Sequence, residues 1–512
     1  MKIYLNVFKN IFKGTLFIFL FILISSKDLI AKSEFKNEII VAQRADAKTL
    51  DPQKSIDTIS NRVINTMFES LLFIDENLKI VPSLAKSWKR LDDLTTIFYL
   101  KENIYFHSGH HMTSEDVIFS LNRARESIQT GYYYSLFENI IPLDKYTIKI
   151  TTSKPFGAMF NYLASSGSSI VCKKSVLSLG EKFAQSPIGT GPYKFKKWIP
   201  GEMIVLEKFN KYHKELTNNK NLIIKIVPEV TNRTIALETG EADIAFDIGT
   251  LDRSFLKSHN DLKLIEVDAP SILYLGFDKT NPLFSNNLKL RQAIAYAIDN
   301  KVLADIVFMG GATPADSPMP PIVPGYNSNI KKYNQNVELA KTLLNEAGYP
   351  SGLNLDLWIT NQSTWIDIAT IIQDQVKQIG INLNIKIFEW GAYVSKTAFP
   401  KKSLYLLSWN VSSIDGDPAL YPLFHSEEKG GSGNRSFYDN TKVDSLLLKA
   451  RTTADQIKRH KLYGQVQEII QEELPHYTLV YPKYNLGAKK SVENLILQKN
   501  GYVNLAKIYI KN

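Results

Sequence analysis

Residues 353–387, LNLDLWITNQSTWIDIATIIQDQVKQIGINLNIKI, hold the pattern that decides the fold class. Apolar and polar residues alternate over 353–357 and again over 381–387, which is the two-residue period of a half-buried strand. Between these segments, apolar side chains follow helical spacing until Gly380, a residue type that commonly ends a helix. The order strand, helix, strand predicts an α/β sheet with helices packed on it.

The same alternation extends on both sides of this segment. Asn336 caps a predicted helix that Gly348 ends, and residues 403–408 form a further predicted strand. Elsewhere the pattern predicts strands at residues 38–43 and 243–246 and helices at residues 60–73, 231–238 and 290–307. The whole chain is therefore expected to be of the α/β class.

The length and composition limit the possible architectures. The chain has 512 residues, whereas single domains usually hold roughly 50–250, so two or three domains are expected. Apolar residues make up 44% and charged residues 22%, which fits a globular protein and excludes a disordered chain or a membrane protein of many spans. The single cysteine, Cys172, cannot form a disulfide within the chain, and alone it cannot hold a zinc site or an iron–sulfur cluster.

The N-terminus has the layout of a secretory signal. Three lysines precede an apolar run at residues 15–24, and small residues follow it up to Ala31. This run is shorter than the roughly 20 residues that cross a bilayer, so we expect residues 1–31 to be a cleaved signal peptide. The net charge of +10 is spread along the chain rather than clustered, so no nucleic-acid partner is expected.

The sequence carries no recognisable enzyme signature. It lacks G-x-S-x-G, G-x-x-x-x-G-K-[ST], H-E-x-x-H and a G-x-G-x-x-G after a strand. His107, His110 and His111 could bind a metal ion, but without helical spacing a solvated loop is the preferred interpretation. Asp415 and Asp417 could form a carboxylate pair, although Asp-Gly-Asp-Pro is more typical of a turn. We therefore expect no catalytic residues, no cofactor and no metal ion; a secreted hydrolase is the less favoured alternative.

Four tryptophans, Trp358, Trp365, Trp390 and Trp409, fall within one short segment of the chain. Three of them lie at or near the ends of predicted strands, and Trp365 opens a predicted helix. In open α/β sheets ligands bind beyond the carboxyl ends of the strands, where such rings suit the walls of a cleft. Burial in the core is the alternative for each ring.

Several motifs together resemble one known family. They are PSLAKSW from residue 82, SPIGTGPYKFKKW from residue 186, ALETGEADI from residue 236, RQAIAYAID from residue 291 and WNVSSIDGDPALYPLF from residue 409. In this order they resemble the solute-binding proteins of oligopeptide, dipeptide, nickel and glutathione ABC importers, which form solute-binding protein family 5. The resemblance covers nearly the whole chain after residue 31.

The resemblance implies a periplasmic-binding-protein-like α/β fold of two lobes with a ligand cleft between them. The implied parts are lobe one at 32–270 plus 482–512, an inserted subdomain within it at about 62–185, lobe two at 271–481, and chain crossings near 268–274 and 478–485. The family also implies a periplasmic monomer without enzymatic activity, which hands its ligand to an ABC permease in the inner membrane. Closure on the ligand would be a hinge motion.

The same resemblance implies where the ligand binds. As in the peptide-binding members, Trp390 and Trp409 are expected to wall the pockets, and the strand at residues 406–411 to offer backbone groups to an extended peptide. The implied ligand contacts are, in full, Tyr274, Trp365, Trp390, Ser408, Trp409, Asn410, Ser412, Asp415 and Asp417.

Two positions depart from the dipeptide-binding members. Ser412 stands where those members carry the aspartate that pairs with the ligand's α-ammonium, and Asp367 stands where they carry the arginine that grips its carboxylate. The Ser-Ser-x-Asp-x-Asp pattern that ends at Asp417 resembles the glutathione-type members instead. The expected ligand is a short peptide, whether dipeptide, oligopeptide or glutathione-like, and its amine is anchored either near Asp417 or by another group. A binding protein for haem, nickel or another chelate is the alternative.

Overall fold

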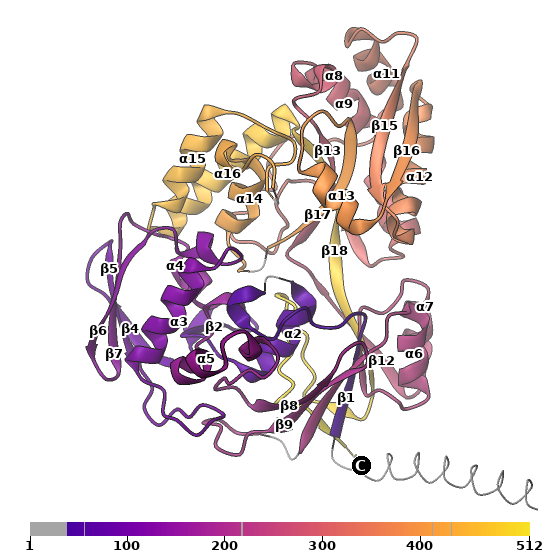
Figure 1. Cartoon of the computed structure of the whole chain (residues 1–512). Helices are drawn as coiled ribbons and strands as arrows, with labels where there is room; N and C mark the ends of the chain where they lie inside the picture. Colours follow the sequence, from indigo (N-terminus) through magenta and orange to yellow (C-terminus); the bar gives the residue numbers. More distant parts are fainter. Residues whose placement is uncertain (1–37, 56, 217–218, 412, 432, 512) are drawn as a thin grey trace, which may run out of the picture.

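The computed structural model describes residues 38–55, 57–216, 219–411, 413–431 and 433–511. The predicted signal peptide and Ser412 lie outside the described residues. The predicted α/β class is confirmed, because a single twelve-stranded sheet with helices packed on it runs through both halves of the molecule (Figure 1). Among the described residues, no helix is both long enough and apolar enough to cross a membrane.

The large sheet is continuous through one long strand, β18 (His476–Lys489). Its order is β16-β15-β17-β13-β18-β11-β1-β10-β9-β8, and β12 and β14 also pair with β18. The strands are β1 (Glu38–Gln43), β8 (Tyr193–Ile199), β9 (Met203–Lys208), β10 (Asn221–Ile226), β11 (Ile244–Phe246), β12 (Leu262–Asp268), β13 (Ser271–Phe277), β14 (Ala312–Pro314), β15 (Leu353–Thr360), β16 (Ile381–Phe388) and β17 (Leu404–Asn410).

The lower half of Figure 1 is built around β1, which lies parallel to its neighbours β10 and β11. The strand is buried on both faces. Ile39 and Val41 share a core with α2 and α5, while Ala42 packs in a second core with α6 and α7. The helices of this half are α2 (Thr58–Met67), α5 (Lys173–Leu179), α6 (Val230–Glu238) and α7 (Asp252–Ser258).

A smaller sheet occupies the lower left of Figure 1, within the range predicted for an inserted subdomain. Its strand order is β4-β5-β7-β6, and it has its own hydrophobic core around Phe98, Leu121 and Ile148. The elements here are β2 (Leu72–Ile74), β3 (Ile80–Pro82), β4 (Ala85–Arg90), β5 (Thr95–Leu100), β6 (Phe137–Asp144), β7 (Thr147–Thr152), α3 (Ser114–Glu126) and α4 (Met159–Leu163).

The upper half contains the segment with which the sequence argument begins. β15 pairs in parallel with both β16 and β17, and α12 packs on these strands through Ile368 and Ile372. A separate core holds α14, α15 and α16 together beside β17. The helices of this half are α8 (Pro282–Ser285), α9 (Leu288–Ala297), α10 (Asn300–Val302), α11 (Val337–Glu346), α12 (Ser363–Lys377), α13 (Trp390–Thr397), α14 (Gly416–Phe424), α15 (Thr441–Arg451) and α16 (Gln456–Glu473).

Two predicted helices are shorter than expected. The helix predicted at 60–73 ends at Met67, whose carbonyl oxygen accepts a hydrogen bond from the backbone N–H of Gly191 at 2.8 Å. A Cβ on Gly189 would lie 2.1 Å from that oxygen, so the glycines permit this close approach. The helix predicted at 290–307 ends at Ala297, because Asp299 caps a new turn there and a π-helical segment, Leu303–Val307, follows.

The chain passes between the two halves where β12 leads into β13 and again along β18. Residues 483–489 of β18 pair with β12, and residues 476–480 pair with β13. Both passages fall on the segments in which the crossings were predicted. The exact lobe boundaries stay a prediction.

Candidate functional site

The C-terminal part of β17 has an edge that no described strand covers. β17 pairs with β13 along its length, but with β15 only at its first two residues. The N–H of Val411 donates to the carbonyl oxygen of Pro270 at 2.7 Å, so by antiparallel alternation the backbone groups of Ser408 and Asn410 point to the other edge. Both residues are exposed. An extended ligand could therefore pair with β17 here.

Two of the predicted aromatic walls lie beside this edge. Trp390 begins α13 and is 46% exposed. The same helix is tied to β17, because the hydroxyl of Tyr393 donates to the carbonyl oxygen of Leu406. Trp409 lies between the two exposed residues of β17; it is half-buried, and its indole Nε1 donates to the carbonyl oxygen of Pro418 at 2.8 Å. Both rings offer apolar surface near the uncovered edge.

Trp365 and Tyr274 are buried in hydrophobic cores instead. Trp365 lies in the core between α12 and the sheet, on the same helical stripe as Ile368. The Tyr274 ring packs 4.4 Å from the ring of His476, centroid to centroid. Burial lowers the pKa of His476 to about 3, as expected of an imidazole inside an apolar core. In this arrangement neither aromatic ring has accessible surface for a ligand.

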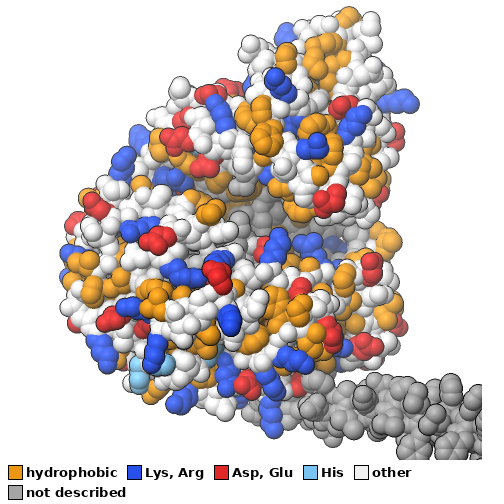
Figure 2. All heavy atoms as spheres, viewed as in Figure 1, with side chains coloured by type: hydrophobic (Ala, Val, Ile, Leu, Met, Phe, Trp, Pro, Cys, Tyr) orange, Lys and Arg blue, Asp and Glu red, His pale blue; other side chains and the backbone are white. Residues whose placement is uncertain are grey.

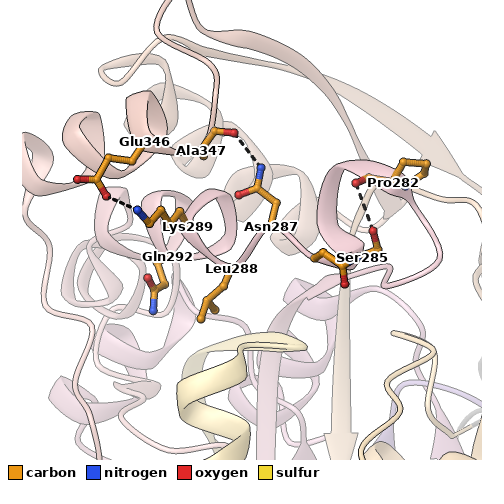
Figure 3. Close-up of a pocket in the computed structure, with 9 residues that line it drawn as sticks. Pro282, Ser285, Asn287, Leu288, Lys289, Gln292, Glu346 and Ala347 are labelled. Carbon is orange, nitrogen blue, oxygen red and sulfur yellow. Dashed lines mark hydrogen bonds and ion pairs between the residues drawn. The ribbon is translucent and has the colours of Figure 1, made fainter.

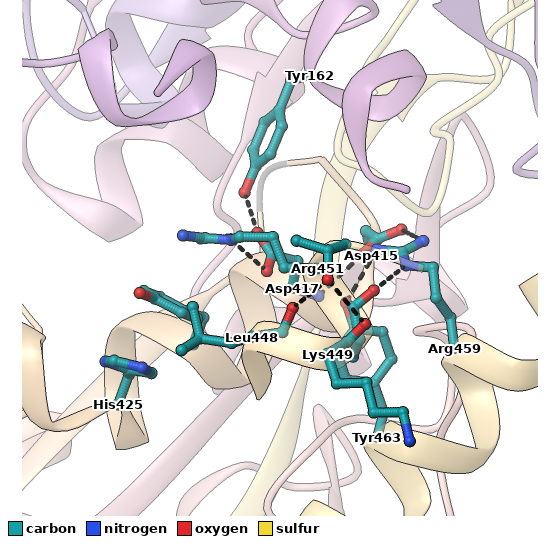
Figure 4. A network of polar contacts seen from close by, with 12 residues as sticks. Tyr162, Asp415, Asp417, His425, Leu448, Lys449, Arg451, Arg459 and Tyr463 are labelled. Carbon is teal, nitrogen blue, oxygen red and sulfur yellow. Dashed lines mark hydrogen bonds and ion pairs between the residues drawn. The ribbon is translucent and has the colours of Figure 1, made fainter. Parts of the chain in front are cut away.

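Asp415 and Asp417 are each held by an arginine (Figure 4). The carboxylate of Asp415 accepts two hydrogen bonds from Arg459, at 2.5 and 2.9 Å. The carboxylate of Asp417 accepts two from Arg451, at 2.9 and 3.0 Å. Both aspartates are almost fully buried, so the two negative charges are compensated within the protein.

The local fold explains why the carboxylates lie at this position. Asp415 is the N-cap of α14 and accepts a hydrogen bond from the backbone N–H of Asp417 at 2.9 Å. Negative charge is favourable in the first turn of a helix, because the backbone N–H groups there lack helical partners. Arg451 ends α15 and Arg459 lies in α16, so three helices converge on the pair of aspartates.

The aspartates also face α4, which belongs to the lower half. The hydroxyl of Tyr162 donates to Asp417 at 2.8 Å, and the side-chain amide of Asn161 donates to the carbonyl oxygens of Ser413 and Ile414, at 3.1 and 3.2 Å. The sequence motif around Asp417 therefore forms a contact between the two halves of the molecule.

Electrostatics keep Arg451 and Arg459 positively charged. Burial by itself lowers the pKa of Arg451 and Arg459, but the adjacent aspartates outweigh it and the net pKa of each guanidinium is raised. Burial, followed by the charge of Asp417, raises the pKa of the Tyr162 phenol, so the phenol remains a hydrogen-bond donor. A ligand amine would meet carboxylates that already have cationic partners. The predicted anchoring of an amine near Asp417 stays a prediction.

A second charged group lies in the lower half and was not predicted. It consists of Arg44, Arg62, Arg233 and Asp247, which we call the arginine cluster. Arg44 directly follows β1 and Asp247 directly follows β11. Since β1 and β11 are parallel neighbours, their carboxyl ends meet at one edge of the sheet. The sequence does show a charged residue directly after each of two predicted strands. That these residues lie together could not be predicted without knowing that the two strands are neighbours in the sheet.

Figure 2 shows a hollow between the upper and lower halves on this face, with basic side chains along its lower rim. A separate pocket lies on the upper half and is lined by residues of α8, α9 and α11 (Figure 3). Its polar groups bond to one another, since Lys289 pairs with Glu346 at 2.9 Å and the amide of Asn287 donates to the carbonyl oxygen of Ala347 at 3.0 Å. None of the residues that line this pocket belongs to β17.

Comparisons with known proteins agree with this architecture. The family model described as bacterial extracellular solute-binding proteins, family 5 Middle, matches residues 79–431. The glutathione-binding protein GsiB of Escherichia coli is 31% identical over 460 residues, which cover 87% of this chain and 89% of that protein.

Two solved structures are similar over almost their whole length. One is the periplasmic binding protein DppA of Helicobacter pylori in complex with the peptide STSA; it is 28% identical, with a TM-score of 0.82 over 94% of this chain and 100% of that chain. The other is NikZ of Campylobacter jejuni in complex with Ni(L-His), at 25% identity and a TM-score of 0.81 over 92% and 99%. The resemblance drawn from the sequence motifs is confirmed: this chain belongs to the bacterial extracellular solute-binding proteins of family 5.

Proposed function

We propose that this protein binds a short peptide, such as a glutathione-like one, between its two halves in the periplasm and delivers it intact to an inner-membrane ABC permease. The uncovered edge of β17 carries the proposal. Ser408 and Asn410 are exposed and point backbone donors and acceptors outward, so an extended peptide can add to the sheet as a further strand. Such pairing does not depend on the ligand's side chains, which suits a carrier of varied peptides.

Two relatives support the choice of ligand class. The E. coli relative is named a glutathione-binding protein, and the H. pylori structure contains the tetrapeptide STSA. Glutathione is itself a small peptide, so the names of both relatives point to ligands that contain amide groups. This shared chemistry agrees with a site built on a strand edge.

The remaining predicted residues take different parts in the proposed site. Trp390 and Trp409 wall it, because their rings flank the edge and keep accessible surface. Asp415 and Asp417 act indirectly. They hold α14 in place, and α14 in turn positions the end of β17, which precedes it in the chain. Trp365 and Tyr274 contribute by filling the cores under β15 and β13.

The proposal includes the two-lobe division and the cellular route. Lobe one at 32–270 plus 482–512 and lobe two at 271–481 move as two bodies about β18 and the β12–β13 passage, and the protein acts as a monomer. Residues 1–31 direct export and are removed. Small-angle scattering of the mature protein tests this: the radius of gyration should fall on ligand addition, at a mass of one chain. An unchanged profile with a bound ligand contradicts closure.

Calorimetry with defined peptides tests the binding function. The peptide STSA and glutathione should bind, and N-methylation of the central amide should weaken STSA at least about ten-fold, because a strand partner loses a donor. Mass spectrometry of the recovered ligand should find it uncleaved. The proposal fails if the peptides are hydrolysed, if methylation has no effect, or if only the nickel–histidine complex binds.

A further inference from the structure

The arginine cluster has more positive charge than its single carboxylate can compensate. Arg62 donates two hydrogen bonds to Asp247, at 2.9 and 2.8 Å, and so uses one face of its guanidinium. The Nε of Arg62 is buried and has no hydrogen-bond partner in the described structure. Arg233 is buried and donates to four backbone carbonyl oxygens, including that of Asp247 at 2.8 Å.

Arg44 is the member that can reach a ligand. Its side chain is 55% exposed, and its contact with Asp247 is a long one, 3.6 Å from Nε to the carboxylate oxygen. Within the described residues, the terminal nitrogens of its guanidinium form no hydrogen bond. An arginine presents a planar pair of donors that matches a carboxylate, so this exposed end is suited to an anionic partner.

The rest of the cluster holds the positive charge in place behind Arg44. Arg62 lies over the ring of Phe246, with its guanidinium carbon 4.1 Å from the ring centroid. Asp247 has a left-handed backbone, with a φ of 56°, which a non-glycine residue rarely adopts. Its N–H donates to the carbonyl oxygen of Asn485 on β18 at 3.3 Å. These contacts fix the cluster against the strand that joins both halves.

The cluster lies next to the strand end described above. Tyr484, the neighbour of Asn485 on β18, donates its hydroxyl hydrogen to the side-chain oxygen of Asn410 at 2.9 Å. Asn410 is the last residue of β17 and one of the two residues with an uncovered edge. The end of β17 at Asn410 is therefore linked through Tyr484 to the segment of β18 that contacts Asp247.

We propose that Arg44, backed by Arg62 and Asp247, binds a carboxylate of the ligand, so that the protein selects peptides with a free carboxylate over their amide analogues. This inference rests on the proposed function and adds a second, lobe-one anchor to it. In this arrangement the upper half binds the peptide backbone, and the lower half binds its carboxylate. A contact from each half to one ligand also favours the closed arrangement.

Matched ligands test the subsite directly. Affinities of glutathione and of STSA are measured by calorimetry, each as the free acid and as the C-terminal amide. The wild-type protein should prefer the acids by about ten-fold or more, as a charge-assisted pair would give. Arg44→Gln should reduce that preference to less than about two-fold by weakening only the acids. Arg44→Lys should retain part of it, because the charge stays while the planar donor pair is lost.

Two controls separate the subsite from general effects. Arg125→Gln removes the same charge from α3, where Arg125 contacts only backbone carbonyl oxygens at 3.4 Å, and should leave the acid preference unchanged. The melting temperature of Arg44→Gln should match the wild type, since Arg44 is exposed with one long contact. The subsite is overturned, and the proposed function stands, if Arg44→Gln keeps the wild-type preference while N-methylation still weakens binding. If neither peptide binds in either form, both proposals are overturned.

Discussion

The two charged groups, the Asp415–Asp417 motif and the arginine cluster, differ in how their charges are matched. In the upper half, Asp415 and Asp417 face Arg459 and Arg451, and all four side chains are largely buried. In the lower half, three arginines surround Asp247, and Arg44 is more than half exposed. The charges of a compensated, buried group are already matched within the fold, whereas an excess of exposed charge is available for a ligand. The contact of Asp415 and Asp417 with a ligand stays a prediction.

The largest expected effect is a loss of stability when the ion pair between Asp415 and Arg459 is broken. Asp415→Ala should destabilise the protein by about 3–5 kcal/mol, because Arg459 would be left buried without its partner. Urea unfolding followed by circular dichroism measures this loss. The double variant Asp415→Leu with Arg459→Met should recover much of it, and a double variant as unstable as the single one would contradict the assignment.

Removing the carboxylate of the arginine cluster should destabilise the protein less. Asp247→Asn is expected to lower stability by about 1–2 kcal/mol, because this carboxylate is 31% exposed and one of its partners, Arg44, is 55% exposed. Burial raises the pKa of Asp247, but Arg62 and Arg44 outweigh it, so the net pKa lies below 3.8. Its stabilisation is therefore present above that pH and lost as the pH falls below it. A loss as large as that of Asp415→Ala would remove the contrast between the two groups.

The aromatic wall should affect binding without affecting folding. Trp390→Ala is expected to weaken peptide binding by about 2 kcal/mol, since its exposed ring would lose contact with the ligand. Calorimetry gives the affinity, and the melting temperature should stay within about 2 °C of the wild type. Phe399→Ala is the matched control, because Phe399 is 65% exposed and lies beyond the end of α13. Equal affinities for both variants would exclude Trp390 from the site.

An effect on stability similar to that of Asp247→Asn is expected at the contact between the halves. Tyr162→Phe should lower stability by about 1–2 kcal/mol, because it removes a buried hydrogen bond to a charged acceptor and leaves the Asp417–Arg451 pair intact. Ligand dissociation, followed by stopped-flow fluorescence, should become several times faster. An unchanged dissociation rate would show that this contact does not resist opening.

Local patterns predicted the elements better than their ends. The alternation at 353–357 predicted β15, which continues to Thr360 because Ile359 and Thr360 are also buried. The helix predicted at 60–73 was too long, since its end is fixed by a contact with Gly191, more than a hundred residues away. Trp365 was open to both interpretations, and its place on the stripe of Ile368 already favoured the core. The periodicity of apolar residues indicates which side chains are buried. It does not indicate which distant residues a segment contacts.

The site residues depended on such partners. Arg451 and Arg459 neutralise the aspartates from 34 and 44 residues further along the chain, and no motif connects them. The uncovered edge at Ser408 follows from the register with β15, which stops pairing after two residues. Arg44 and Asp247 are about 200 residues apart and meet only because β11 inserts beside β1.

The placement of Asp417 affects how easily the two halves of the molecule can separate. Its cation, Arg451, sits in the same half, so parting the halves leaves no bare ion behind. Separation breaks hydrogen bonds from uncharged donors of the lower half, namely Asn161, Tyr162 and the backbone N–H of Gly157, each worth about 1–2 kcal/mol. The contact between the halves therefore relies on uncharged donors, and under the proposed function a bound ligand is what favours the closed arrangement.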